Sequence, residues 1–438
     1  MIGDMFRFIH AADIHLDSPL KGLEQYDGAP VDAIRGATRR ALENLVGLAL
    51  AERVDFLLIA GDLYDGTWRD HNTGLFFVRQ MSRLREAGIP LYLIAGNHDA
   101  VNKMTRSLRL PQNPGGDDPF FPAKAAETRR LEHLGVAIHG RSFQSAAEMS
   151  NLALQYPAAD PGLINIGLLH TSLEGDAEHD RYAPCTLDDL RSKEYQYWAL
   201  GHIHKRRIVA EDPPIVFSGN IQGRHIREAG AKGCYLISVD DRGKVSPEFH
   251  PLDVFRWAEC DVDCSAAASG DEILDRFRRR LQELLDASGG LSLGVRVILR
   301  GASPFHQTLA AREEQWIAEI RSAAIDHAAD LVWIEKVRFA TTYPPASEAG
   351  LHGDAAAEEL SAILDKLAAS DDQLRQLAEE LAPLKTKLPA ELLDGADALA
   401  LDDPAWLRSV LTEVQPLLLS RLSPSSSVSA SGSTQERS

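Results

Sequence analysis

Residues 91–99 read LYLIAGNHD. The apolar run from Leu91 to Ala95 has the length and composition of a buried strand, and Gly96 permits a tight turn after it. Two residues of the metal-ligand type, Asn97 and His98, and an acid, Asp99, follow that glycine directly. In layered α/β proteins, side chains just beyond the carboxyl ends of strands converge on one crevice. The stretch therefore predicts a strand that ends at a chemically active turn.

The same kind of pattern extends from Phe6 to about Leu252, where short β-rich runs alternate with helical periodicity. Four further strands are predicted over 6–11, 56–60, 165–169 and 197–200. An amphipathic helix is predicted over 31–52, between the first two of these strands. The order strand, helix, strand is typical of stacked layers, and it places this part of the chain in the α/β class.

Side chains that bind metals follow the ends of these predicted strands. They are Asp13, His15, Asp62, Asn97, His170, His202 and His204. Two of the motifs are weak alone, because Asp-x-His occurs by chance and Gly-Asp is a common turn, whereas GNHD at 96–99 is more specific. Together, and in this order, they predict a centre for two divalent cations, which lie about 3.5–4 Å apart in such sites and share a ligand. Asp62 is the candidate bridge, since a carboxylate presents two oxygens and an imidazole presents one outward nitrogen at a time.

The remaining ligands divide between the two cations. Asp13, His15 and His204 could complete one shell, while Asn97, His170 and His202 complete the other. Nitrogen and oxygen donors without a thiolate favour two divalent metal ions, with Mn²⁺ first and Fe²⁺ or Zn²⁺ as alternatives, over copper or an iron–sulfur cluster. We expect phosphodiester hydrolysis in which the metals neutralise charge on the phosphate oxygens and His98 donates a proton to the leaving oxygen.

These motifs together resemble the signature of the calcineurin-like metallophosphoesterases. Within that superfamily, the forms AADIHLDSPL (11–20), AGDLYDG (60–66), AGNHD (95–99) and GHIHKR (201–206) resemble the SbcD group of DNA-repair nucleases. FSGNIQGRHIREAGAKGCYLI (217–237) looks closest to its YhaO-type branch. The resemblance implies a layered β-sandwich flanked by helices and the metal ligands named above. It also implies that Asp99 orients a His98 imidazole lying beside the metals, whereas the role of Asp65, where some members carry histidine, stays unassigned.

The pattern changes after residue 251, and it predicts helices over 271–285 and 312–325 and strands over 295–299 and 331–339. We expect four parts: a metallophosphoesterase (nuclease) domain at 1–254, a small α+β domain at 255–343, a helical region at 344–422 and a disordered Ser-rich tail at 423–438. The resemblance implies that the second part caps the active site and guides DNA.

Leucines and isoleucines recur at helical spacing between residues 360 and 381. Such stripes usually pack on the parent domain. The resemblance offers a second interpretation, in which this region docks on the coiled-coil base of an SbcC-like ATPase and the nuclease subunits form a homodimer.

The formal net charge of −18 disfavours attraction of nucleic acid to the whole surface, so a DNA site must be local. Basic side chains follow the last pair of predicted metal ligands: Lys205, Arg206, Arg207, Arg224 and Arg227. Because Lys and Arg contacts to phosphates supply most sequence-independent affinity for DNA, we expect these residues to bind DNA. The alternative is a solvated turn.

The chain has no run of about 18 apolar residues, and residues 1–10 lack the pattern of a signal peptide. Its four cysteines are too scattered for a disulfide framework. We therefore expect a cytoplasmic protein that does not enter the membrane.

The leading functional hypothesis is a metal-dependent DNA exonuclease or endonuclease that works in DNA repair with an ATPase. The main alternative is a general or small-molecule phosphodiesterase of the cyclic-nucleotide type, because a fold does not fix a substrate. A scaffold that kept the fold without its chemistry is a third possibility, and the complete ligand set argues against it.

Overall fold

The computed structural model describes residues 4–18, 34, 36–65, 71–101, 110–173, 182–342, 344, 355–385, 387–388 and 399–422. The chain divides into two compact units. The first comprises Met1–Cys260, Arg280–Val297 and Arg321–Lys336, and the second comprises Asp261–Arg279, Ile298–Ile320 and Val337–Ser438. The division into four parts expected from the sequence stays a prediction, and the Ser-rich tail lies outside the described residues. No helix in the described part of the chain has both the length and the hydropathy to cross a membrane.

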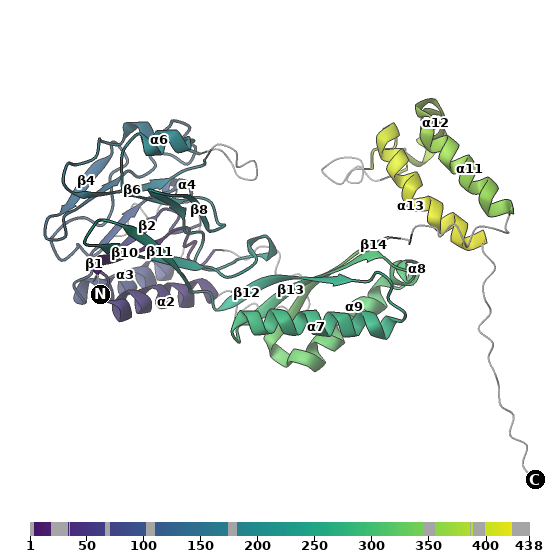
Figure 1. The fold of residues 1–438 in the computed structure, drawn as a ribbon, viewed down its shortest axis with the longest axis horizontal. Helices are drawn as coiled ribbons and strands as arrows, with labels where there is room; N and C mark the ends of the chain where they lie inside the picture. The colour runs from purple at the N-terminus through teal and green to yellow at the C-terminus, as the bar shows by residue number, and fades with distance from the viewer. Residues whose placement is uncertain are drawn as a thin grey trace, which may run out of the picture. The chain divides into compact units, whose positions relative to one another are not determined.

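One sheet of the first unit has five strands in the order β11-β10-β1-β2-β3 (Figure 1). Their bounds are β1 Asp4–Ala11, β2 Phe56–Ala60, β3 Leu91–Ile94, β10 Gly233–Asp240 and β11 Val245–Pro251. Strands β1, β2 and β3 are parallel, and β10 is antiparallel to β1. Every residue of β2 and β3 is buried, as expected of parallel strands that are covered on both faces.

The second sheet has six strands in the order β4-β5-β6-β7-β9-β8. Their bounds are β4 Glu127–Leu131, β5 Val136–Gly140, β6 Ile164–His170, β7 Tyr197–Gly201, β8 Arg207–Glu211 and β9 Pro214–Phe217. Strands β5, β6, β7 and β9 are parallel, and β8 and β4 are antiparallel to their neighbours. All five strands predicted from the sequence between residues 6 and 200 are confirmed to within two residues at either end.

The two sheets pack face to face through large apolar side chains. The rings of Phe8 and Phe56 lie 4.7 Å apart, and Tyr197 from the opposite sheet meets Phe8 edge-on at 5.5 Å. Because neighbouring residues of a strand point to opposite faces, Phe8 faces the other sheet while Ile9 faces the helices. Burying each such side chain contributes about 1.5–3 kcal/mol to stability.

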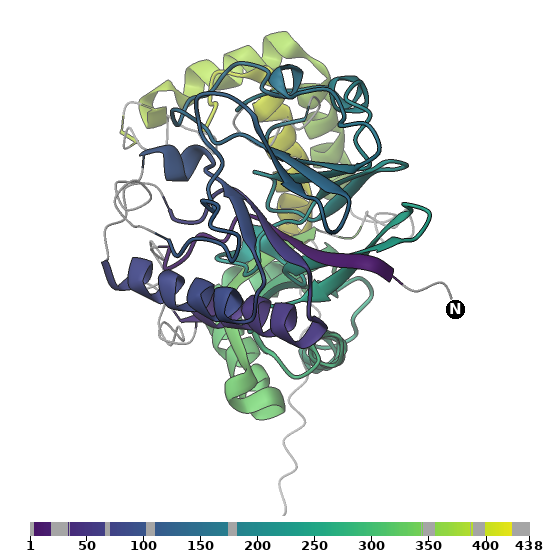
Figure 2. The same cartoon turned by 90° about the vertical axis from the view of Figure 1, so that its left-hand side faces the viewer.

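Helices α2 (Ala37–Glu52) and α3 (His71–Glu86) cover the outer face of the five-stranded sheet, as Figures 1 and 2 show. They contribute Leu42, Leu45 and Phe77 to the cluster that also holds Ile9 and Leu57. This layered sandwich flanked by helices confirms the predicted fold class. Helix α2 begins at Ala37, and residues 31–33 and 35 of the predicted helix lie outside the described part of the chain.

The described part of the first 260 residues also holds the short helices α4 Asn97–Val101, η2 Ala153–Gln155, α6 Leu187–Arg191 and η3 Ile226–Glu228. The next segment forms a three-stranded sheet in the order β12-β13-β14. Its elements are β12 Phe255–Asp263, α7 Gly270–Ser288, β13 Ser292–Ala302, α8 His306–Ala311, α9 Glu313–Ala328, η4 Ala329–Leu331 and β14 Val332–Thr342. The two helices and two strands predicted there are confirmed, and β12 is an addition. A helical region follows with α11 Ala355–Ala369, α12 Asp371–Lys385 and α13 Pro404–Leu422.

A buried histidine joins the two sheets close to the carboxyl ends of β1 and β7. His10 Nδ1 lies 2.9 Å from the Tyr197 hydroxyl, and His10 Nε2 lies 3.2 Å from the carbonyl oxygen of Leu200. Strands β1, β2 and β3 run parallel to one another, as do β6 and β7, and residues at their carboxyl ends lie close together, so the turns that follow them meet at one edge of the sandwich.

Candidate metal centre

Four of the predicted ligands have left-handed backbone conformations. The φ angles are 49° at Asp13, 44° at His15, 54° at Asp62 and 98° at His202. For a residue with a Cβ atom this conformation costs about 1–3 kcal/mol, and it persists only where the surrounding structure imposes it. Here the amide of Asp13 donates to the carbonyl of Gly61, and the amide of His15 donates to the carbonyl of Asp62, each at 3.0 Å. Strain concentrated in this way is typical of functional sites.

Glycines bring the strand ends close enough for their side chains to meet. A Cβ atom on Gly96 would lie 2.3 Å from Asp62 Oδ1 and 2.8 Å from the His170 ring. A Cβ atom on Gly201 would lie 1.9 Å from the carbonyl oxygen of Ala60. The glycines of the GNHD and GHIH motifs are therefore required by close approach.

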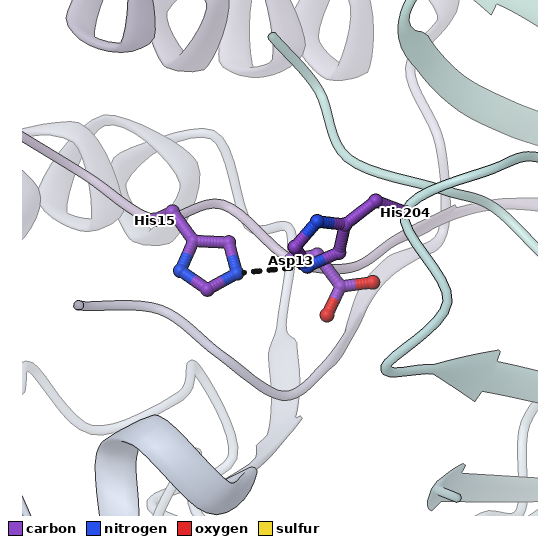
Figure 3. Close-up of side chains that lie close together, drawn as sticks. All are labelled: Asp13, His15 and His204. Carbon is purple, nitrogen blue, oxygen red and sulfur yellow. Dashed lines mark hydrogen bonds between the residues drawn. The ribbon is translucent and has the colours of Figure 1, made fainter. Parts of the chain in front are cut away.

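His15, His204 and Asp13 form the first group of candidate ligands (Figure 3). The Nε2 atoms of the two imidazoles face each other at 3.1 Å, and one ligand atom from each of the three residues lies within 4.8 Å of the others. Metal–nitrogen bonds of about 2.0–2.1 Å place two imidazole nitrogens on one cation roughly 3 Å apart. This group therefore has the spacing that a divalent cation needs.

Asp13, Asp62 and His170 form the second group. His170 Nδ1 lies 2.8 Å from the carbonyl oxygen of Ala60, which accepts its proton and leaves Nε2 directed at the site. That Nε2 lies 3.0 Å from Asn97 Oδ1 and 3.5 Å from Asp62 Oδ2. Asp62 Oδ2 is also 3.8 Å from His15 Nε2, so this carboxylate lies between the two groups, where a bridging ligand would stand.

His202 is buried beside this second group, with its ring centroid 5.2 Å from that of His170. Its backbone amide donates to the Asp13 carboxylate at 3.1 Å. None of the three candidate metal groups among the described residues includes the His202 side chain, so its ligand role stays a prediction.

The electrostatics of the centre fit a site for cations. Burial raises the pKa of the Asp13 carboxyl. Burial alone would also raise the pKa of Asp62, but the charges and hydrogen bonds of the neighbouring histidines, led by His170, hold it well below its usual range. Two buried carboxylates are costly unless cations compensate them. The donor set of imidazole nitrogens, carboxylate oxygens and an amide oxygen suits manganese, iron or zinc.

The expected orientation of His98 by Asp99 is corrected by the structure. The buried Asp99 carboxylate accepts hydrogen bonds from the amides of Leu63, Tyr64 and Gly96 at 3.0–3.2 Å. It joins the turns after β2 and β3, because these amides come from the ends of both strands. The His98 ring instead pairs with Asp65, whose Oδ1 lies 2.9 Å from His98 Nδ1.

Asp65 therefore belongs to the site, and its charge acts on His98. Burial lowers the pKa of His98, but the hydrogen bond to Asp65 and the charges of Asp62 and Asp65 outweigh burial and raise it. Ligand atoms of His15, Asp62 and His98 also lie within 4.8 Å of one another. The position of His98 suits proton transfer at the centre, and its role as proton donor stays a prediction.

Glu228 is a second residue of the site that the sequence reasoning did not identify. It is buried, and its Oε1 lies 2.7 Å from His204 Nδ1 and 2.8 Å from an Arg224 side-chain nitrogen. The only signal in the sequence is the spacing of an arginine and a glutamate four residues apart, which is common on any surface helix.

The predicted DNA contacts fall into two kinds. Lys205, Arg206, Arg207 and Arg227 are exposed, and the Arg206 guanidinium stacks on the Phe249 ring at 3.8 Å. The Arg224 side chain is only 14% exposed. Contact of any of these residues with DNA stays a prediction.

Comparison with known proteins bears directly on this site. The family model "Calcineurin-like phosphoesterase" matches residues 6–206, and the model "Metallophosphoesterase YhaO, middle domain" matches residues 257–342. The chain is 35% identical over 323 residues to the uncharacterized metallophosphoesterase YhaO of Bacillus subtilis, covering 73% of this chain and 75% of that protein. It is 27% identical over 308 residues to the DNA double-strand break repair protein Mre11 of Sulfurisphaera tokodaii, covering 68% and 74%. A crystal structure of a dimetal phosphatase from Danio rerio matches 56% of this chain and 99% of its own at 12% identity, with a TM-score of 0.35.

The fold and the candidate ligands define a phosphoester hydrolase with a dinuclear centre for divalent metals. The chain belongs to the calcineurin-like metallophosphoesterase family. Within that family its similarity to the YhaO protein covers three quarters of that relative's length.

Proposed function

We propose that this chain is a metal-dependent DNA nuclease, an exonuclease or endonuclease, that acts in DNA repair. The observation that carries the proposal is the position of Lys205, Arg206 and Arg207. These exposed cations follow the candidate ligand His204 directly and lead into β8, the edge strand of its sheet. Phosphates bound there would lie beside the metal centre. The repair function in the name of the Mre11 relative, and the likeness of the motifs to the SbcD group, support the same assignment.

The chemistry follows from the arrangement of the side chains. When bound, two divalent cations neutralise charge on the phosphate oxygens and make the attacking water more acidic. We propose Mn²⁺ as the metal, with Fe²⁺ and Zn²⁺ as alternatives. Because Asp65 accepts the proton on His98 Nδ1, the other ring nitrogen is the one that donates to the leaving oxygen. The raised pKa of His98 favours the protonated imidazole that a proton donor requires.

We also propose that helices α11 to α13 bind an SbcC-like coiled-coil ATPase and that the nuclease works as a homodimer. Exposed apolar side chains on each of the three helices, Ile363, Leu384 and Leu418, support a docking role. Replacing Ile363 with Glu should weaken co-purification with such an ATPase while leaving metal-dependent hydrolysis unchanged. Unaltered binding after all three positions are replaced would contradict this part of the proposal.

The test of the function is cleavage of labelled single- and double-stranded DNA beside hydrolysis of bis-p-nitrophenyl phosphate, in Mn²⁺, Fe²⁺ or Zn²⁺. A variant with Lys205 and Arg207 changed to Gln should lose DNA cleavage and keep turnover of the small diester. Turnover of the small diester with no DNA cleavage, with or without an ATPase partner, would favour the alternative of a general or small-molecule phosphodiesterase.

A further inference from the structure

A buried ion pair lies behind the candidate ligand His204. Glu228 is 5% exposed, and hydrogen bonds from three residues converge on its carboxylate. They come from His204 Nδ1 at 2.7 Å, the Arg224 amide at 2.8 Å, the Arg224 guanidinium at 2.8 Å and Asn220 Nδ2 at 2.9 Å. A carboxylate bound in this way has little freedom to move, so the atom that meets His204 has a fixed position.

The contact with Glu228 determines which nitrogen of His204 faces the centre. A carboxylate at Nδ1 accepts a proton there, which leaves the Nε2 lone pair directed at the Nε2 of His15. The backbone of His204 is held as well, because its carbonyl accepts from Lys232 Nζ at 3.0 Å. Contacts with Glu228 and Lys232 therefore fix the ring orientation, the tautomer and the backbone position of His204.

Arg224 extends the same network to the other side of the centre. Its guanidinium donates to Glu228 and also lies 3.9 Å from Asp65 Oδ2. Asp65 in turn holds His98 Nδ1 at 2.9 Å. One guanidinium thus connects the carboxylate behind a candidate metal ligand with the carboxylate behind the candidate proton donor.

We infer that Arg224 and Glu228 are positioning residues that set the geometry of His204 and, through Asp65, of His98. This inference rests on the proposed function for the role of His98, but not for that of His204. It replaces the expectation that Arg224 binds DNA, because its guanidinium is 14% exposed, donates to Glu228 and faces Asp65. Lys205, Arg206, Arg207 and Arg227 stay candidates for DNA contact.

A DNA contact and a positioning role for Arg224 predict different effects when this residue is mutated. A DNA contact would leave metal affinity and turnover of a small diester unchanged after mutation, and would alter only the KM for DNA and its salt dependence. If Arg224 is a positioning residue, its mutation would lower the metal affinity and would lower kcat for both substrates. Loss of a carboxylate behind a ligating histidine typically weakens metal binding by about 10–100-fold.

The experiment compares Glu228→Gln, Arg224→Met and Arg224→Lys with Arg242→Gln, a control at an exposed arginine. Titration calorimetry of the metal-free proteins with Mn²⁺ should show binding weakened about 10–100-fold in Glu228→Gln and, to a smaller degree, in both Arg224 variants. The kcat for bis-p-nitrophenyl phosphate at saturating Mn²⁺ should fall in the same three variants and stay unchanged in Arg242→Gln.

Wild-type affinity and kcat in folded Glu228→Gln and Arg224→Met would overturn the inference. If Glu228→Gln does not fold, the Arg224→Lys variant tests the inference instead. This variant keeps the buried positive charge and loses only the planar, forked donor geometry of the guanidinium. An absence of DNA cleavage in the wild type would count against the nuclease proposal alone, since neither readout uses DNA.

Discussion

The Asp65 carboxylate lies 2.9 Å from His98 Nδ1, while Asp99, the next residue after His98, makes its contacts with the backbone amides of two turns. The acid that acts on His98 therefore comes from the turn after β2. Asp65 and Asp99 both lie within the metal-ligand motifs of the sequence, but they have different roles. Asp99 holds the turns together, and Asp65 controls the imidazole.

Replacing Asp65 with Asn should change the pH dependence of hydrolysis. The Asp65 charge raises the pKa of His98, so its removal should lower that pKa. Because a proton donor must be protonated, activity falls as the pH rises through its pKa, and the alkaline limb should shift to lower pH in Asp65→Asn. The measurement is the pH profile of kcat for bis-p-nitrophenyl phosphate at saturating metal. Asp241→Asn, a change at an exposed acid, is the control, and an unshifted limb in Asp65→Asn would contradict the pairing.

Replacing His98 with Ala should separate catalysis from metal binding. We expect turnover to fall by about 10²–10⁴-fold, the usual contribution of a general acid, with the metal content of the protein unchanged. Metal analysis of the purified variant beside its kcat checks this. If metal and activity disappear together, His98 is a metal ligand, as its proximity to His15 and Asp62 would also permit.

Glycine 96 should tolerate no side chain. In Gly96→Ala the new Cβ would meet Asp62 Oδ1 at 2.3 Å, so either the carboxylate or the turn must move. Displacement of a reacting group by about 1 Å can cost roughly 100-fold in rate, and we expect a loss of that order together with weaker metal binding. The matched control is Gly47→Ala within α2, where a Cβ would meet nothing within 4 Å. That change should stabilise the helix by about 0.5–1 kcal/mol without affecting activity. Equal activity of the two variants would show that the close approach does not matter.

His10 should make the fold sensitive to acid. Burial lowers its pKa to about 3 from an ordinary value of 6.5. Above pH 6.5, His10 is unprotonated in both the folded and the unfolded state. As the pH falls from 6.5 toward 3, only the unfolded state takes up the proton, and stability is lost by about 1.4 kcal/mol per pH unit.

Denaturant unfolding at a series of pH values compares the wild type with His10→Asn. The variant is expected to be less stable at neutral pH, because it loses the contact with Tyr197, but its stability should fall less steeply on acidification. The control is His133→Asn, at an exposed position, which should keep the wild-type slope. Parallel curves for wild type and His10→Asn would rule out this residue as a source of acid sensitivity.

Much of the architecture around the site was predictable, because strands that are buried on both faces read as continuous apolar runs. The strands that end before Asp62 and Asn97 are of this kind. Strand β12 was harder, since its sequence FRWAECDVD mixes charged and apolar residues and its buried positions become apparent only once its partner strands are placed.

The positions of the candidate ligands at the strand ends were predictable from the sequence. The residues that hydrogen-bond to His204 and His98 were not. His204 and Glu228 are 24 residues apart, and no periodicity connects them. Asp65 and His98 come from turns after different strands, so only the parallel register of β2 and β3 brings them together. The resemblance to the family instead implied the neighbouring Asp99.

The most direct test of the account is electron paramagnetic resonance of the protein loaded with Mn²⁺, with the amount of bound metal determined on the same sample. We predict about two Mn²⁺ per chain and the exchange-coupled spectrum of ions about 3.5–4 Å apart, both lost in Asp62→Ala. A saturated wild-type protein that binds a single Mn²⁺, or that shows only the spectrum of isolated ions, would contradict a dinuclear centre built from these side chains.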